Sequence, residues 1–174
     1  MDRMTTREQN VLKLALPVLL FLGACGGDDN GGGGGGGTPP VPPTPVVAYV
    51  ANQTSNSVSA FTINATSGAL IPVAGSPFPV GTTPGGIAVS TDGTLAYVPN
   101  QGSNTVSAFS VNTATGVPTA VNGSPFGAGT TPFKVTVSPN RSFVYVTNQG
   151  SNNVSAFSID ALGRLTPLPG SPFA

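Results

Sequence analysis

Few side chains in this sequence could perform chemistry. After residue 45 the charged residues are the cations Lys134, Arg141 and Arg164 and the carboxylates Asp92 and Asp160, and the sequence contains no histidine. Hydrolysis needs a base to activate water and a cation or donor to stabilise an oxyanion. The serines and threonines, although numerous, have no evident base to activate them as nucleophiles. We therefore predict no catalytic residue.

The best candidate for binding is the neighbouring pair Phe133 and Lys134, which offers a cation for an anionic ligand beside an apolar wall. A similar segment earlier in the chain has Gly85 and Gly86 in these places. The alternative interpretation is ordinary surface variation between copies. Two separated aspartates are too few ligands for a metal ion, so we predict neither a metal nor a cofactor.

The charge balance excludes one class of partner. Basic and acidic residues are equal in number, for a formal net charge of zero, and only 7% of residues are charged. Nucleic-acid binding needs a basic stripe that neutralises phosphates. We therefore predict no nucleic-acid partner.

A repeated unit must position these residues. Tyr49, Tyr97 and Tyr145 stand 48 residues apart, within the copies YVANQTSNSVSAF, YVPNQGSNTVSAF and YVTNQGSNNVSAF. Gly-Ser-Pro-Phe closes each copy. A repeat of this length indicates one supersecondary unit that packs against copies of itself.

One period, residues 84–131, contains four short segments of strand character separated by turn residues, at 87–90, 95–99, 106–112 and 118–126. Such strands form an antiparallel meander, and a period of about 40–50 residues is typical of a propeller blade. The predicted fold is all-β, built from four-stranded antiparallel β-propeller blades. In such a blade Phe133 and Lys134 lie at the same end as the Asn-Gln-x-Ser-Asn turns. Arg141, Asp160 and Arg164 lie at the opposite end.

A family resemblance rests on YVTNQGSNNVSAFSID followed by LTPLPGSPF, with Val-Ser-Pro at 137–139. These phrases resemble the lactonase-like, YVTN-repeat β-propellers of bacteria, and the resemblance covers residues 46–174. It implies a ring that usually has seven blades and, in some members, opening of the lactone of 6-phosphogluconate. The repeated phrases specify blade structure and carry no catalytic residue.

Residues present in every copy are assigned to the blade itself, because an active site is not needed three times. We expect the tyrosines and phenylalanines to fill the space between blades, the alanines to let sheets approach, and the asparagines to bond turn backbone. Besides the tyrosines, these residues are Phe61, Phe109, Phe157, Ala60, Ala108, Ala156, Asn52, Asn56, Asn100, Asn104, Asn148 and Asn152.

The copies predict an incomplete arc of just under three blades. A partial blade that lacks its innermost strand covers 46–78, and full blades cover 79–126 and 127–174. About 11 strands are fewer than the 16 of a four-bladed ring. Either the chain is a truncated copy of a longer propeller, or several chains associate through exposed blade faces. We prefer truncation, because a self-assembling fragment would be expected to carry its own closing strand.

The first 24 residues have the pattern of a signal peptide. Arg3, Arg7 and Lys13 precede the apolar run LALPVLLFL, which is too short to span about 30 Å of hydrocarbon. The following LGAC, ending in Cys25, resembles the lipobox of bacterial lipoproteins, in which the cysteine is lipidated and becomes the N-terminus. The alternative is a buried lone cysteine.

Residues 25–45 are predicted to be a Cys-anchored tether. Seven consecutive glycines and the run TPPVPPTP cannot bury enough surface to offset backbone ordering. The lipoprotein resemblance implies an outer-membrane location, because Gly26 follows the cysteine where an aspartate would favour the inner membrane. The predicted partner is therefore the membrane, through lipidated Cys25.

Two functions remain open. The first is a lipid-anchored cell-envelope propeller module, or its remnant, with a binding or structural role and no catalysis. The second is a fragment of a lactonase-type hydrolase, similar to a 6-phosphogluconolactonase, whose catalytic residues lie in other blades.

Overall fold

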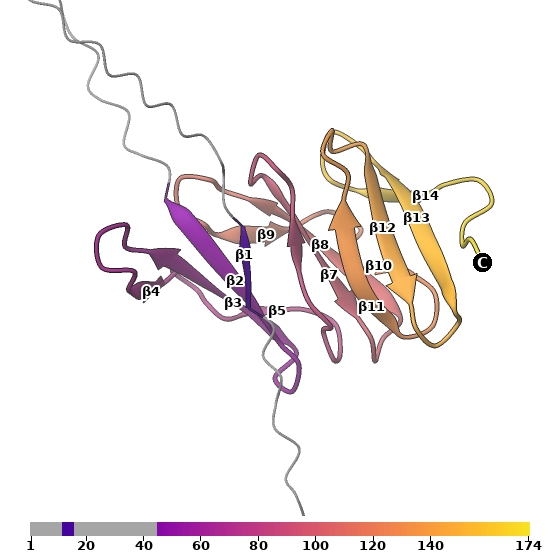
Figure 1. Ribbon diagram of the computed structural model, residues 1–174, viewed down its shortest axis with the longest axis horizontal. Coiled ribbons are helices and arrows are strands. Elements are labelled where there is room, and N and C mark those ends of the chain that lie inside the picture. Colours follow the sequence, from indigo (N-terminus) through magenta and orange to yellow (C-terminus); the bar gives the residue numbers. More distant parts are fainter. Residues whose placement is uncertain (1–11, 16–44) are drawn as a thin grey trace, which may run out of the picture.

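The computed structural model describes residues 12–15 and 45–174. Most of the predicted signal peptide and tether, including Cys25, lies outside the described residues. Every regular element in the described ranges is a β-strand, and no helix there is long and apolar enough to cross a membrane. The strands form three antiparallel sheets that stand side by side (Figure 1).

The second sheet shows the complete unit. Four strands follow one another as antiparallel neighbours from the inside outward. A fifth short strand, like the fourth, pairs with the third. They are β6 (Ala88–Val89), β7 (Leu95–Asn100), β8 (Thr105–Val111), β9 (Pro118–Ala120) and β10 (Phe126–Gly127). The predicted four-stranded meander is confirmed.

The outer segment, predicted as one strand over 118–126, is divided into β9 and β10, which pair with different halves of β8. Between them Gly123 has a φ of +88°, and Ser124 Oγ accepts a 2.9 Å hydrogen bond from the backbone N–H of Ala108. The hydroxyl thus satisfies a backbone donor that a continuous outer strand would have paired. The same bond recurs from Ala60 to Ser76 and from Ala156 to Ser171.

The third sheet repeats this order. Its strands are β11 (Pro132–Val137), β12 (Phe143–Asn148), β13 (Asn153–Ile159) and β14 (Leu165–Pro167). An isolated bridge between Val154 and Phe173 takes the place that β10 has in the second sheet.

The first sheet has a different innermost strand. Its repeated part forms β2 (Val46–Asn52), β3 (Ser57–Ile63), β4 (Leu70–Pro72) and β5 (Phe78–Pro79). The repeat supplies no strand inside β2, and β1 (Leu12–Ala15), from the predicted signal segment, pairs there antiparallel. This pairing occupies an edge whose backbone groups would otherwise lack ladder partners.

Each pair of neighbouring sheets encloses one apolar cluster. Tyr49 of the first sheet packs with Val98 and Phe109 of the second, and Tyr97 of the second packs with Val146 and the other apolar residues of the third. Successive side chains of a strand point to opposite faces, so β7 supplies both clusters. The second sheet is therefore covered on both faces, as blades of a propeller are.

A tyrosine hydroxyl connects each sheet to the next. Tyr49 donates to the carbonyl of Gly116 at 2.7 Å, and Tyr97 donates to that of Gly163 at 3.0 Å. The two glycines have φ values of +75° and +84°. An added Cβ would lie 2.9 Å from a methyl of Val47 at Gly116, and 2.6 Å from a methyl of Leu95 at Gly163. Glycine is required here both by the backbone conformation and by the close approach of the sheets.

The turn asparagines bond differently from the prediction. The side-chain nitrogen of Asn100 donates to two hydroxyls on the next strand, at 3.1 and 3.0 Å, and not to turn backbone. Asn56 and Asn104 accept hydrogen bonds from the backbone of Thr83 and Thr131, each 27 residues further on. The second asparagine of a turn therefore holds the segment that enters the next blade.

Burial between blades is confirmed for Tyr49, Tyr97, Phe109 and Phe157, but not for Phe61, which is half-buried, or for Tyr145. The Tyr145 side chain is 39% exposed, because no described sheet covers that face of the third sheet. Its ring contacts the ring of Phe143, with centroids 6.4 Å apart.

Candidate binding site

The innermost strand of the third sheet begins with an irregularity. The register of β11 against β12 shifts between Pro132 and Lys134, so that Phe133 is the extra residue of a β-bulge. A bulge re-aims a side chain away from the regular pleat, and Phe133 is 37% exposed. The substitution seen in the sequence therefore places an aromatic ring at the surface.

The Lys134 ammonium lies over the Phe133 ring, 4.7 Å from its centroid. This distance is within the range of a cation–π contact. The backbone N–H of Lys134 donates to Thr147 Oγ1 at 3.1 Å, which ties the bulge to β12. The ring and the cation are thus presented together, as the sequence suggested.

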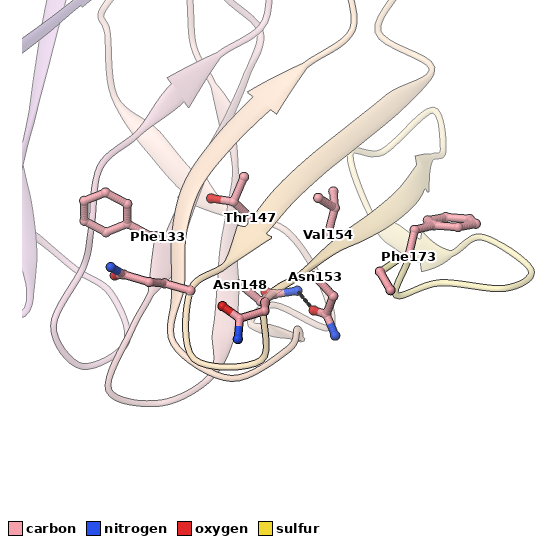
Figure 2. Close-up of a pocket in the computed structure, with 9 residues that line it drawn as sticks. Phe133, Thr147, Asn148, Asn153, Val154 and Phe173 are labelled. Carbon is pink, nitrogen blue, oxygen red and sulfur yellow. Dashed lines mark hydrogen bonds between the residues drawn. The ribbon is translucent and has the colours of Figure 1, made fainter.

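A pocket of about 360 Å³ opens beside Phe133 and is lined also by Asn148, Gln149, Asn152 and residues near the C-terminus. Figure 2 shows Phe133 at one side of this pocket and Phe173 at the other. The volume lies within the usual range of small-molecule sites. The predicted proximity of Phe133 to the Asn-Gln-x-Ser-Asn turn is confirmed, whereas Lys134 is not one of the lining residues.

The floor of this pocket contains a buried amide. Asn148 donates from Nδ2 to Asn153 Oδ1 at 2.8 Å (Figure 2), but its own Oδ1 is buried without a hydrogen-bond partner among the described atoms. Asn100, at the same place in the enclosed second sheet, has the same unpaired oxygen. The unpaired oxygen therefore occurs in the second and third blades alike and does not distinguish the pocket.

The charges at the opposite end of the blades form ion pairs that the sequence analysis did not predict. Arg141, in the β11–β12 turn, pairs with Asp92, in the β6–β7 turn of the preceding blade. Arg164 Nε lies 2.6 Å from Asp160 Oδ2 within one turn. The sequence contained a signal for the first pair. Arg141 replaces the glycine that follows Asp92 in the same turn one period earlier.

These contacts keep both carboxylates ionised. Burial opposes ionisation of Asp92, but hydrogen bonds from Ser90 and Thr94 and the charge of Arg141 hold its pKa below the usual value. Hydrogen bonds from the backbone and side chain of Arg164 lower the pKa of Asp160. A carboxylate with a lowered pKa is a weak base, and both lie away from the Phe133 pocket.

The tyrosine hydroxyls are also engaged. Burial raises the pKa of Tyr49 to about 12 and raises the pKa of Tyr97 well above its ordinary value. Each hydroxyl is already a donor to a backbone carbonyl. Within the described ranges, no group of three or more His, Cys, Asp or Glu could hold a metal ion.

A second, smaller pocket of about 200 Å³ lies between the first and second sheets, against Tyr49, Val89, Asp92 and Thr113. Its carboxylate is the one that Arg141 neutralises. The Phe133 pocket is larger, and Lys134, over the Phe133 ring, has no carboxylate partner among the described residues. It is therefore the better candidate for binding an anion.

Solved structures share the fold of residues in this chain. A candidate 6-phosphogluconolactonase of Bacteroides fragilis matches with 26% identity and a TM-score of 0.64 over 70% of this chain and 34% of that chain. A protein of unknown function from Desulfotomaculum acetoxidans matches with 27% identity and a TM-score of 0.62 over 70% and 37%. The periplasmic gluconolactonase of Pseudomonas aeruginosa matches with 26% identity and a TM-score of 0.61 over 74% and 38%. The chain therefore aligns with about a third of the length of each structure.

No curated protein matches the sequence. The family model described as lactonase, seven-bladed β-propeller, matches residues 43–172, which cover the three repeated units except for the last two residues. The chain belongs to the lactonase family of seven-bladed β-propellers and contains a part of such a propeller.

Proposed function

We propose that this chain is a lipid-anchored, non-catalytic β-propeller module of the bacterial cell envelope, with a binding or structural role. The observation that carries the proposal is the pairing of Asp92 and Asp160 with arginines. These are the two carboxylates of residues 45–174. Neither is free to act as a base beside the Phe133 pocket.

Binding is assigned to Phe133 and Lys134. The aromatic ring forms one wall of the pocket and holds the ammonium at its face. A small anion with an apolar part fits this combination, because the cation attracts the charge while the ring buries the carbon skeleton. A sugar-acid phosphate carries anionic groups that the Lys134 ammonium can bind and a carbon skeleton that can pack on the Phe133 ring. It is therefore a suitable probe.

The binding test is titration of the purified full chain with 6-phosphogluconate, followed by NMR or calorimetry. We expect Lys134→Ala to weaken binding roughly tenfold or more, since a hydrogen bond to a charged group contributes about 1.5–3 kcal/mol. Arg164→Ala is the matched control, because it removes an exposed cation at the opposite end of the same blade. Equal losses in both variants would refute the assignment.

The anchor is tested separately. Cys25 is the single cysteine of the chain, and one match is a periplasmic protein, which supports an envelope location. Labelled palmitate should be incorporated into the wild-type chain and not into Cys25→Ser. Incorporation into both, or into neither, would contradict a lipid anchor at this residue.

The second candidate function is that of a lactonase fragment, favoured by the family match and by the candidate 6-phosphogluconolactonase and the gluconolactonase among the similar structures. It is tested by measuring hydrolysis of glucono-δ-lactone and 6-phosphoglucono-δ-lactone. The non-catalytic proposal expects the purified chain to leave the spontaneous rates unchanged. Acceleration that saturates with substrate would refute the non-catalytic proposal. Its loss in Asp92→Asn or Asp160→Asn would assign catalysis to this chain, and not, as the fragment hypothesis does, to other blades.

A further inference from the structure

Among the described residues, nothing covers the two outer faces of the three-sheet arc as equivalent residues inside the arc are covered. On the third sheet Tyr145 is 39% exposed, whereas Tyr97 at the same place in the second sheet is fully buried. On the first sheet Leu70 is 49% exposed, whereas Leu165 at the same place in the third sheet is 5% exposed. Each open face thus shows the side chains that an internal contact buries.

The faces are also complementary in hydrogen bonding. Inside the arc, Tyr49 and Tyr97 each donate to the carbonyl of a glycine in the next blade. Among the described residues the third tyrosine, Tyr145, and the third glycine, Gly68, have no such bond. One face therefore lacks an acceptor and the other lacks a donor.

Gly68 already has the conformation that the internal contacts use. Its φ is +70°, beside +75° for Gly116 and +84° for Gly163. An added Cβ on Gly68 would meet nothing within 4 Å, whereas it would be 2.9 Å or less from the preceding blade at the two internal glycines. The acceptor turn is preformed, and no described residue occupies the space over it.

We propose that a second copy of this chain docks head to tail on these faces, with Tyr145 of one copy donating to the Gly68 carbonyl of the other. The contact continues an interface that the chain forms twice within itself, so it needs no new chemistry. By the same register, Phe143 and Leu168 of the first copy would lie against Gly68 of the second. Head-to-tail docking would join the copies through the same kind of contact that joins the sheets within one chain.

The test is sedimentation equilibrium of the full chain in density-matched detergent, over a range of protein concentrations. We expect a reversible assembly of at least two chains. If the mass stays at that of one chain up to about 100 μM protein, the binding free energy is weaker than about 5 kcal/mol. That result would overturn the proposal.

Two variants locate the contact. Gly68→Ala should raise the dissociation constant at least tenfold, because the added methyl enters the space that the partner's side chains occupy. Gly93→Ala is its control: this glycine has a φ of +74° and only Thr113, at 3.8 Å, near an added Cβ. The backbone strain is therefore matched, and the dissociation constant should not change.

Tyr145→Phe should also weaken association, by about tenfold, because it removes one hydroxyl and leaves a buried carbonyl unpaired. Tyr49→Phe removes the same bond inside the chain and should leave association unchanged while lowering unfolding stability. If the chain associates but neither Gly68→Ala nor Tyr145→Phe weakens it, the copies meet through other surfaces and the proposal is wrong.

Discussion

The second and third blades have the same strand order and share the repeated sequence phrases, but their tyrosines have different environments. Tyr97 is fully buried and bonded to Gly163, while Tyr145 is 39% exposed. Both lie in the middle of the second strand of a meander. The repeat thus specifies where a side chain points, and the next blade decides whether that side chain is buried.

The largest expected effect comes from truncating the two tyrosines. Tyr97→Ala should lower the free energy of unfolding by about 3–5 kcal/mol, as for large buried aromatic residues. Tyr145→Ala should lower it by less than about 1 kcal/mol. Urea denaturation, at concentrations where the transition does not depend on protein concentration, measures both. Equal losses would show that the two environments are alike in solution.

Gly68 and Gly163, which occupy the same turn of the first and third sheets, should show the same contrast with a smaller difference in stability. Gly163→Ala places a methyl 2.6 Å from a methyl of Leu95, so it combines overpacking of about 1–3 kcal/mol with left-handed strain of about 1 kcal/mol. Gly68→Ala has the strain alone. Thermal unfolding of the two variants beside the wild type should rank them in that order, and the reverse order would contradict the close approach of the sheets.

Alkaline pH should weaken the internal contacts. Burial raises the pKa of Tyr49 from 10.0 to about 12, so the folded state holds this proton more tightly than the unfolded state. Its contribution is complete below pH 10 and is lost as the pH rises to 12 and beyond. Unfolding stability should fall over this window, with tyrosinate absorbance rising as the chain unfolds. In Tyr49→Phe, unfolding stability should fall less steeply with pH over this window.

The smallest effect is expected at the ion pair between the second and third blades. Asp92→Asn should cost no more than about 1 kcal/mol, because Asp92 and Arg141 are each about one-third exposed and solvent screens the pair. The pKa of Asp92 is lowered, so its contribution is present above its unfolded pKa and is lost as the pH falls through the lower folded value. Chemical denaturation of wild type and variant at neutral and strongly acidic pH should show a difference at neutral pH alone.

Much of the fold could be predicted because the pattern that determines it is local. Alternating apolar residues and turn residues recur in each copy, and they fix strands, order and the end of the blade that carries Phe133. The break in the outer strand depends on the Ser124 hydroxyl reaching the backbone of Ala108. Strand propensity gives no sign of that contact.

The polar contacts between blades were harder to predict. Asn56 bonds a residue 27 positions away, and Arg141 pairs with a residue 49 positions away. Such contacts require knowing which turns of adjacent blades meet. The bulge that exposes Phe133 depends on its pairing with β12, although the unusual residue itself was visible in the sequence.

The tyrosine–glycine bonds have a consequence for how such chains change length. They join residues 67 and 66 positions apart, which is more than one 48-residue period, so no unit completes its own contact. Each unit supplies a hydroxyl to its successor and, by the same rule, a carbonyl to its predecessor. Duplicating or deleting a whole period at any point would restore every junction at once, whereas losing a few residues within a strand would break two. Genes of this kind can therefore grow and shrink in units of one blade without redesigning a single junction.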